Sequence, residues 1–101
     1  MTKKSQETRD HLMRDIEAYT CGEEPSPLEM LRAARIENWE AAVRCRGTEF
    51  VLVVSGDVYK HPEIDDGMPI QSPAVIWFDR NFRWVRTTNR LYALGERTGR
   101  R

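Results

Sequence analysis

One polar segment carries residue types that can perform acid–base or metal chemistry. Three carboxylates, Glu63, Asp65 and Asp66, lie between His61 and Ser72. A histidine beside carboxylates can transfer protons or bind a metal ion. His-Pro and Asp-Gly are also typical of turns, where an aspartate caps backbone amides. We therefore expect His61, Asp65 and Asp66 to shape a loop. A small hydrolase or metal-dependent enzyme centred on His61 and Asp66 ranks last of the functions considered.

A second group combines arginines with aromatic rings near the C-terminus. Residues 81–101 hold six arginines against a single acidic residue, whereas residues 21–40 and 61–80 are acidic. Arginine beside aromatic side chains can contact phosphate and stack on bases. An acidic protein partner would also suit a basic surface. The candidate binding residues are Arg86, Arg90, Tyr92, Arg97, Arg100 and Arg101.

Arg86 also has a structural interpretation. If the segment Phe82–Thr88 is a strand, Arg86 shares a face with Trp84. A buried arginine requires a partner for its charge, and Asp66 or Asp79 could supply one. We favour this ion pair, which would join the acidic loop to the sheet, over an exposed binding role for Arg86.

Motifs for metals and cofactors are absent from the sequence. His11, Cys21, Cys45 and His61 match no structural zinc spacing. The two cysteines form no C-x-x-C pair, so we interpret them as reduced thiols. The sequence has no glycine-rich phosphate loop, nucleophile elbow or dinucleotide fingerprint. We expect no cofactor, no metal and no catalytic residue.

The composition is that of a small globular domain. The 101 residues are 40% hydrophobic and 32% charged, with no net charge, and this length suits one modest core. Even the longest apolar runs, such as Phe50–Val54, are far shorter than the ~18 residues of a membrane span. The first ten residues lack the apolar segment of a signal peptide. We therefore expect a cytoplasmic protein without a membrane partner.

Two helices are expected before residue 36. Thr8–Thr20 has apolar residues at helical spacing, and residues 1–7 are expected to fray. Ser26 can cap a second helix, and Glu29 completes a capping box three residues later. Proline suits the first position of this helix, which should run over Pro27–Ala34.

The remainder of the chain favours strands. Ile36–Arg46 alternates as a half-buried strand does, although a continued helix stays open. Glu49–Val54 is apolar throughout, which predicts a central strand covered on both faces. Asp57–Lys60 could continue that strand. Ala74–Phe78 and Phe82–Thr88 flank a polar turn and predict a β-hairpin.

These elements predict an α+β fold. Two N-terminal helices would pack on one face of a small curled antiparallel sheet of three or four strands. The domain would occupy residues 8–95. Residues 96–101 would form a flexible basic tail.

Four segments carry a resemblance to a known family. They are Pro25–Met30 followed by Trp39, His61-Pro62, Asp66–Pro73 and Trp84–Gly95. In this pattern the chain resembles small uncharacterised alphaproteobacterial proteins of the DUF6634 type, over Pro25–Gly95. Gln71 and Asn89 stand where that pattern has threonine and serine. The resemblance implies one fold unit and a bacterial origin, and it implies no catalytic role.

Three functions follow from these features. The first is a non-catalytic interaction or regulatory module that binds another macromolecule, with a protein partner favoured. The alternative is a nucleic-acid-binding accessory protein that uses the C-terminal arginines. The hydrolase centred on His61 comes third. A free edge strand would also permit a homodimer.

Overall fold

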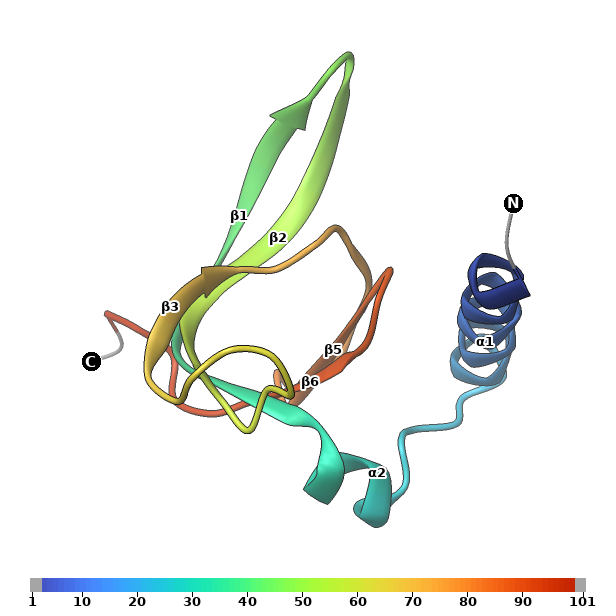
Figure 1. Ribbon diagram of the computed structural model, residues 1–101, viewed down its shortest axis with the longest axis horizontal. Helices are drawn as coiled ribbons and strands as arrows, with labels where there is room; N and C mark the ends of the chain where they lie inside the picture. Colours follow the sequence, from blue (N-terminus) through green and yellow to red (C-terminus); the bar gives the residue numbers. More distant parts are fainter. Residues whose placement is uncertain (1–2, 100–101) are drawn as a thin grey trace.

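The computed structural model describes residues 3–99, with side chains described from residue 9. Figure 1 shows a strongly curled sheet with the two helices on its outside. The elements are α1 (Lys3–Thr20), α2 (Pro27–Arg32), β1 (Ala34–Arg46), β2 (Glu49–Tyr59), β3 (Met68–Gln71), β4 (Val75–Phe78), β5 (Trp84–Thr87) and β6 (Leu91–Leu94).

All six strands belong to one mixed sheet in the order β3-β2-β1-β6-β5-β4. β1 and β6 are parallel, and every other neighbouring pair is antiparallel. The two outer strands, β3 and β4, are joined by three residues, so the sheet must roll to bring its edges together. Ser72 closes the roll: its N–H donates to the Val54 carbonyl at 2.8 Å, and its hydroxyl accepts from the Val54 N–H at 2.9 Å.

The interior of the roll is a single apolar core. Fully buried valine and isoleucine side chains each contribute roughly 1.5–3 kcal/mol. The buried cluster consists of Ala34, Ile36, Trp39, Val54, Val58, Val85 and Tyr92. Because these residues come from β1, β2, β5 and β6, the core holds together strands that are far apart in the sequence.

The predicted sheet of three or four antiparallel strands is wrong, because the sheet has six strands and is mixed. Two strands, β3 and β6, are not predicted by the sequence patterns. β3 contains Pro69, which is tolerated because β3 is an edge strand. β6 has four residues without alternation, and its parallel pairing with β1 joins Ala34 to Tyr92. Local periodicity carries no signal for such a distant pairing.

The two helices contact different strands of the sheet. α1 contacts β4, and α2 contacts β6. The Tyr19 ring on α1 lies 5.7 Å from the Trp77 ring and 4.8 Å from the Trp84 ring, between centroids. α1 begins at Lys3, within the segment that was predicted to fray. No helix within residues 3–99 combines the length and the apolar character needed to cross a membrane.

Several local predictions are confirmed. α2 begins at the capping box: the Ser26 hydroxyl accepts from the Glu29 N–H at 3.1 Å, and the Glu29 carboxylate accepts from the Ser26 N–H at 2.8 Å. The segment from residue 36 to residue 46 is a strand rather than a helix. β4 and β5 form the expected hairpin.

The β1–β2 hairpin extends beyond the rolled sheet as a two-stranded arm. β6 pairs with β1 at residues 34–36, and β3 pairs with β2 at residues 55–58. Residues 40–53 therefore project, as Figure 1 shows, and we call them the arm. Glu49–Val54 was predicted to be covered on both faces, which is wrong because Phe50 is 77% exposed. The cause is the length of the hairpin, since no other strand reaches its tip.

Candidate functional site

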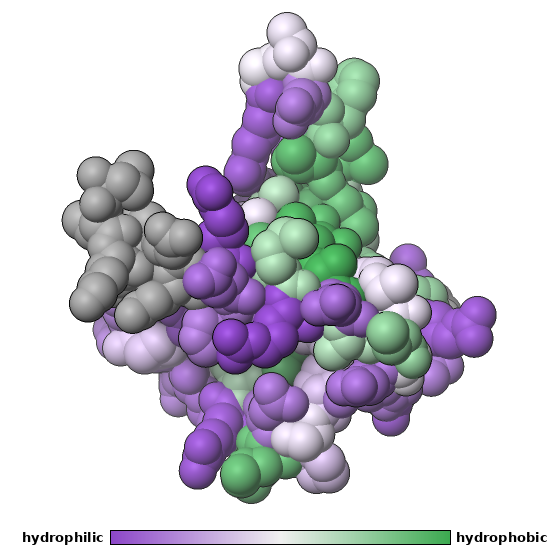
Figure 2. Space-filling view, turned by 90° about the vertical axis from the view of Figure 1, so that its right-hand side faces the viewer, coloured by the Kyte–Doolittle hydropathy of each residue, from purple (hydrophilic) through white to green (hydrophobic). Residues whose placement is uncertain are grey.

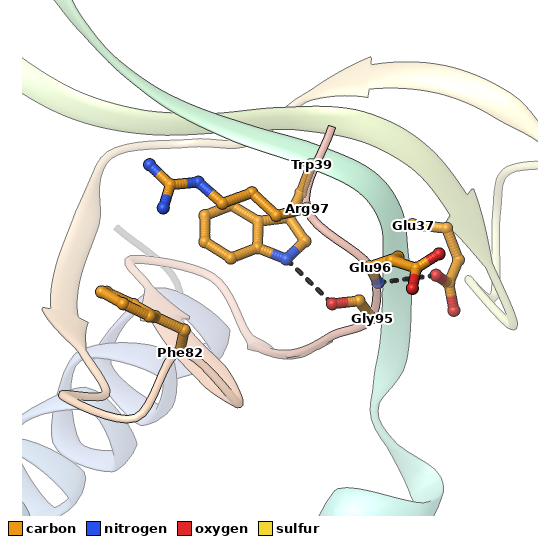
Figure 3. A pocket seen from close by; sticks show the side chains of 6 residues that line it. All are labelled: Glu37, Trp39, Phe82, Gly95, Glu96 and Arg97. Carbon is orange, nitrogen blue, oxygen red and sulfur yellow. Dashed lines mark hydrogen bonds between the residues drawn. The ribbon is translucent and has the colours of Figure 1, made fainter. Parts of the chain in front are cut away.

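The pocket that combines aromatic rings with charged groups lies where β1, the β4–β5 turn and the segment after β6 meet. Its volume is about 540 Å³ (Figure 3). The segment after β6 stays beside β1: the Trp39 N–H donates to the Glu96 carbonyl, and the Thr98 N–H donates to the Trp39 carbonyl. The residues 96–98 are thus paired where the sequence predicts a flexible tail. The lining residues are Glu37, Trp39, Phe82, Gly95, Glu96 and Arg97.

Trp39 forms the fixed wall of the pocket. A bulge in β1 between Glu37 and Glu40 shifts its register against β2, and Asn38 adopts a φ of 52° there. The bulge turns Trp39 inward, so that its side chain is buried against the core. The indole Nε1–H donates to the Gly95 carbonyl at 3.0 Å. This bond fixes the orientation of the ring.

Phe82 forms the opposite wall from a strained turn. Its φ of 61° is rare for a residue with a Cβ. The buried Asp79 holds the turn: its carbonyl accepts from the Phe82 N–H at 3.0 Å, and its carboxylate accepts from the Arg83 N–H at 2.9 Å. The Phe82 ring remains 53% exposed and lies 6.1 Å from the Trp39 ring. The turn therefore presents an aromatic ring to solvent beside the indole.

The Arg97 guanidinium lies against both rings. Its Cζ lies 5.4 Å from the Trp39 ring centroid and 5.8 Å from that of Phe82, both within cation–π range. Figure 3 shows its side chain extending over the indole. None of the salt bridges between described side chains involves Arg97. The aromatic faces are thus the principal partners of this guanidinium.

Glu37 supplies a fixed negative charge at the rim. Its carboxylate accepts from the Glu96 N–H at 2.8 Å and from Arg35 Nε at 2.6 Å. The bond from the Glu96 backbone, followed by that from Arg35, lowers the pKa of Glu37 below its ordinary value. The carboxylate lies directly over Gly95, where a Cβ would come within 2.2 Å of it. A side chain at position 95 would therefore displace the Glu37 carboxylate.

The lining of the pocket has the chemistry to hold a cation. Two ring faces attract positive charge, and the carboxylates of Glu37 and Glu96 increase the attraction. The lining includes no histidine, serine or cysteine that could act as a base or nucleophile. Across the described residues, no group of three or more His, Cys, Asp or Glu side chains could hold a metal ion.

The candidate residues from the sequence lie in separate places. Arg86 is buried, and its Nε donates to the Asp15 carboxylate at 2.9 Å, so its partner is on α1 instead of being Asp66 or Asp79. Tyr92 is buried in the core, and burial raises the pKa of its phenol. Arg97 belongs to the aromatic pocket. Arg100 and Arg101 lie outside the described residues.

The His61 loop engages its polar groups locally. His61 Nδ1 accepts from the Glu63 N–H at 3.0 Å, and the Asp66 carboxylate accepts from the Lys60 N–H at 2.9 Å. The Asp65 carbonyl accepts from the Met68 N–H at 3.3 Å. Burial, and then the charge of Arg90, lowers the pKa of His61. These groups stabilise turns and do not converge on a shared point.

Arg90 lines a second pocket, of about 400 Å³, together with other cations. Arg32 from the last turn of α2 and Lys60 from the end of β2 line the same space. Glu29 is the acidic residue of that lining, and one of its carboxylate oxygens already accepts from the Ser26 N–H. Within residues 9–99, these three cations form no salt bridge. The pocket is therefore electropositive.

The pairing of Trp39 with Phe82 was missed from the sequence. The sequence predicts Trp39 as part of the half-buried strand Ile36–Arg46, and Phe82 as the first residue of the strand Phe82–Thr88. A signal for the turn is Asp79, because an aspartate three residues before Phe82 can accept backbone N–H groups. The meeting of β1 with residues 95–97 depends on a parallel pairing that the sequence pattern does not reveal.

Comparisons with known proteins found no matching family model, no matching curated protein and no matching solved structure. The proposals below are therefore argued from the geometry and chemistry of this chain alone.

Proposed function

We propose that this protein is a non-catalytic interaction module that binds a cationic side chain of a protein partner against the rings of Trp39 and Phe82. The observation that carries the proposal is the position of Arg97, whose guanidinium lies against both rings. A pocket that accommodates one guanidinium has the shape and charge to accept another. The arginine of a partner protein is the ligand that best matches this chemistry.

The strain at Phe82 supports a binding role. A φ of 61° for a phenylalanine costs of order 1–3 kcal/mol, and such strain concentrates at functional sites. Phe82 also leaves half of its ring in contact with water. A turn selected only for stability would favour glycine or asparagine at this φ. A preformed aromatic face for a ligand accounts for retaining phenylalanine.

Arg97 would act as a stand-in that the partner displaces. It is exposed and, among the described side chains, has no carboxylate partner, so little holds it beyond the rings. An exposed cation–π contact is worth about 0.5–1 kcal/mol. A competing arginine could overcome that amount readily. Removing Arg97 should therefore increase affinity for a free cation.

The test is titration of the protein with acetyl-Gly-Arg-Gly-amide, followed by the NMR signal of the Trp39 indole N–H. Acetyl-Gly-Gln-Gly-amide is the neutral control. We expect millimolar binding of the arginine peptide, which Arg97→Ala strengthens about threefold or more. Equal responses to both peptides, or weaker binding by Arg97→Ala, would contradict the proposal.

Two matched variants separate the ring from the backbone strain. Phe82→Gly removes the ring at a position where glycine suits φ, so the fold should persist while peptide binding is lost. Lys60→Gly changes another residue with positive φ, 64°, outside the aromatic pocket. It should retain binding. Loss of binding in both variants would point to a general structural effect.

The second pocket supports one alternative function, which is binding of nucleic-acid phosphates. Arg32, Lys60 and Arg90 converge there without salt bridges to described side chains. Fluorescence anisotropy with mixed-sequence DNA and RNA would then fall steeply with salt. The double variant Arg32→Gln/Arg90→Gln should weaken binding, and Arg97→Gln should not. Unchanged binding by the double variant would exclude this pocket.

A further inference from the structure

Among residues 3–99, one edge of the arm has no partner strand. β1 is paired along this edge with β6 at residues 34–36 and with Glu96 and Thr98 at Trp39. Beyond Trp39, the pairing of the segment Glu40–Arg46 that the described residues show is with β2, on its opposite edge. An isolated two-stranded hairpin is only marginally stable, and a long free edge invites pairing with another strand.

The direction of the backbone groups on this edge follows from two bonds. The Trp39 N–H and carbonyl both point away from β2, toward residues 96 and 98. Because these directions alternate along a strand, Ala41, Val43 and Cys45 present their N–H and carbonyl groups on the same side. Val54 on β2 agrees with this alternation, since its groups point to Ser72 on the other edge.

The free segment is complementary to itself. Its seven residues, Glu40–Arg46, have Val43 at their centre. A second copy running antiparallel around a two-fold axis at Val43 would place Val43 opposite Val43 and Ala41 opposite Cys45. Each such pair has outward backbone groups and would exchange two hydrogen bonds. Shifting the axis to Ala42 would leave Cys45 opposite Trp39, whose edge is already occupied.

The side chains agree with this alignment. Glu40 at one end of the segment would lie opposite Arg46 at the other, so both ends form pairs of opposite charge. An axis at Arg44 would instead oppose two arginines. On the face that carries Val43, this alignment keeps each apolar side chain beside an apolar one, and on the other face Ala42 would lie opposite Arg44.

The apolar face of the arm also requires a neighbour. Antiparallel pairing places Val43 beside Leu52, and Cys45 beside Phe50, on the face that continues the core. Val43 is 62% exposed and Phe50 is 77% exposed. Figure 2 shows a green band of apolar side chains along the arm. Pairing across the two-fold axis would widen this ladder and cover part of Val43.

We infer that the partner of the arm is a second copy of this chain, joined through the β1 edges in a continuous four-stranded β2-β1-β1-β2 sheet centred on Val43. The interface is isologous, as expected for a two-fold homodimer. In this arrangement, two segments lie along the same edge of β1. Residues 96–98 of the same copy lie beside Trp39, and the arm of the second copy lies beside Glu40–Arg46. The aromatic pocket therefore lies near the interface but contributes none of its hydrogen bonds.

The first test uses disulfide cross-linking. In a Cys21→Ser/Cys45→Ser background, Val43→Cys would place two thiols on directly opposed residues. Their Cα atoms would lie about 5.5 Å apart, which suits a disulfide. We expect most of the protein to become a dimer on non-reducing gels after mild copper–phenanthroline oxidation. Thr48→Cys, at the tip of the arm, is the matched control and should remain monomeric.

The second test breaks the edge without breaking the fold. Val43→Pro removes an outward N–H that β2 does not use, so the circular-dichroism spectrum should be retained. Sedimentation should give twice the chain mass of 11.8 kDa for the wild type and the single mass for Val43→Pro. A wild type that stays monomeric at about 100 µM would overturn the inference. That concentration is roughly a hundred times a Kd of ~1 µM.

A charge exchange decides between this register and any other. Arg46→Glu alone should weaken the dimer at least tenfold, because two like charges would face each other at each end. Glu40→Arg/Arg46→Glu should restore it. A wild-type dimer that Val43→Cys fails to cross-link, or that the double variant fails to restore, would show that another surface joins the copies.

Discussion

The Arg86 guanidinium, carried by buried strand β5, lies 2.9 Å from the Asp15 carboxylate on α1. The Arg86 side chain is 6% exposed, whereas that of Asp15 is 39% exposed. Arg86 also donates to the Thr87 carbonyl at 2.8 Å. This pair links the N-terminal helix to the sheet near the aromatic contact of Tyr19 with Trp84. It explains how a helix with little contact area keeps its position.

Removing the charge of Asp15 should loosen this link. Asp15→Asn leaves Arg86 buried without a full countercharge, and we expect a loss of about 1–2 kcal/mol in the free energy of unfolding. Half-exposure of Asp15 limits the loss. Urea denaturation measures it. Asp10→Asn, an exposed neighbour on α1, is the control and should change stability by less than about 0.5 kcal/mol.

Gly95→Ala should distort the rim of the aromatic pocket. The new Cβ would lie 2.2 Å from the Glu37 carboxylate, which must then leave its bonds to Glu96 and Arg35. We expect a loss of about 1–2 kcal/mol in unfolding free energy. In Glu37→Ala/Gly95→Ala the clash is absent, so the two effects should not add. Additive losses in urea denaturation would contradict this cause.

Acidification should remove the stabilisation that Glu37 provides. Its pKa is lowered in the folded state, so its contribution is present above the unfolded carboxyl pKa of about 4.3. The contribution is lost as the pH falls through the folded pKa. The difference in unfolding free energy between wild type and Glu37→Gln should therefore shrink from pH 7 to pH 3. A constant difference would show that the carboxylate charge is irrelevant.

Alkaline pH should act through Tyr19. Burial, and then the charge of Asp15, raises the pKa of Tyr19 to about 12, which means that the fold favours the neutral phenol. Stability from this preference is full below the unfolded tyrosine pKa of about 10 and declines as the pH rises toward 12. Tyr19→Phe should therefore lose less stability than wild type between pH 9 and pH 11 in urea denaturation.

The sequence predicts what local patterns determine. The capping box of α2 and the turn between Ala74–Phe78 and Phe82–Thr88 depend on neighbouring residues, and both are present. The parallel β1–β6 pairing depends on contacts between distant residues, which periodicity does not encode. For the same reason, the sequence patterns did not predict the aromatic pocket. Trp39, Phe82 and Arg97 are far apart in the chain and meet only because the sheet rolls.

The apolar run Glu49–Val54 shows a second limit. Its composition fits a strand covered on both faces, yet Phe50 projects on the arm. A sequence specifies that a residue prefers burial, and it does not specify whether the cover comes from the same chain. If the arm pairs with a second copy, as inferred above, part of that preference is met between molecules.

The most direct measurement follows Arg97 itself by NMR in the wild-type protein. Its side-chain protons should be shifted upfield by the Trp39 and Phe82 rings, because the guanidinium lies 5.4 Å and 5.8 Å from their centroids. Adding acetyl-Gly-Arg-Gly-amide should move these signals to their free positions as the peptide replaces Arg97, and acetyl-Gly-Gln-Gly-amide should not. Arg97 signals that stay unchanged while the arginine peptide is added to saturating concentration would contradict a cation-binding pocket.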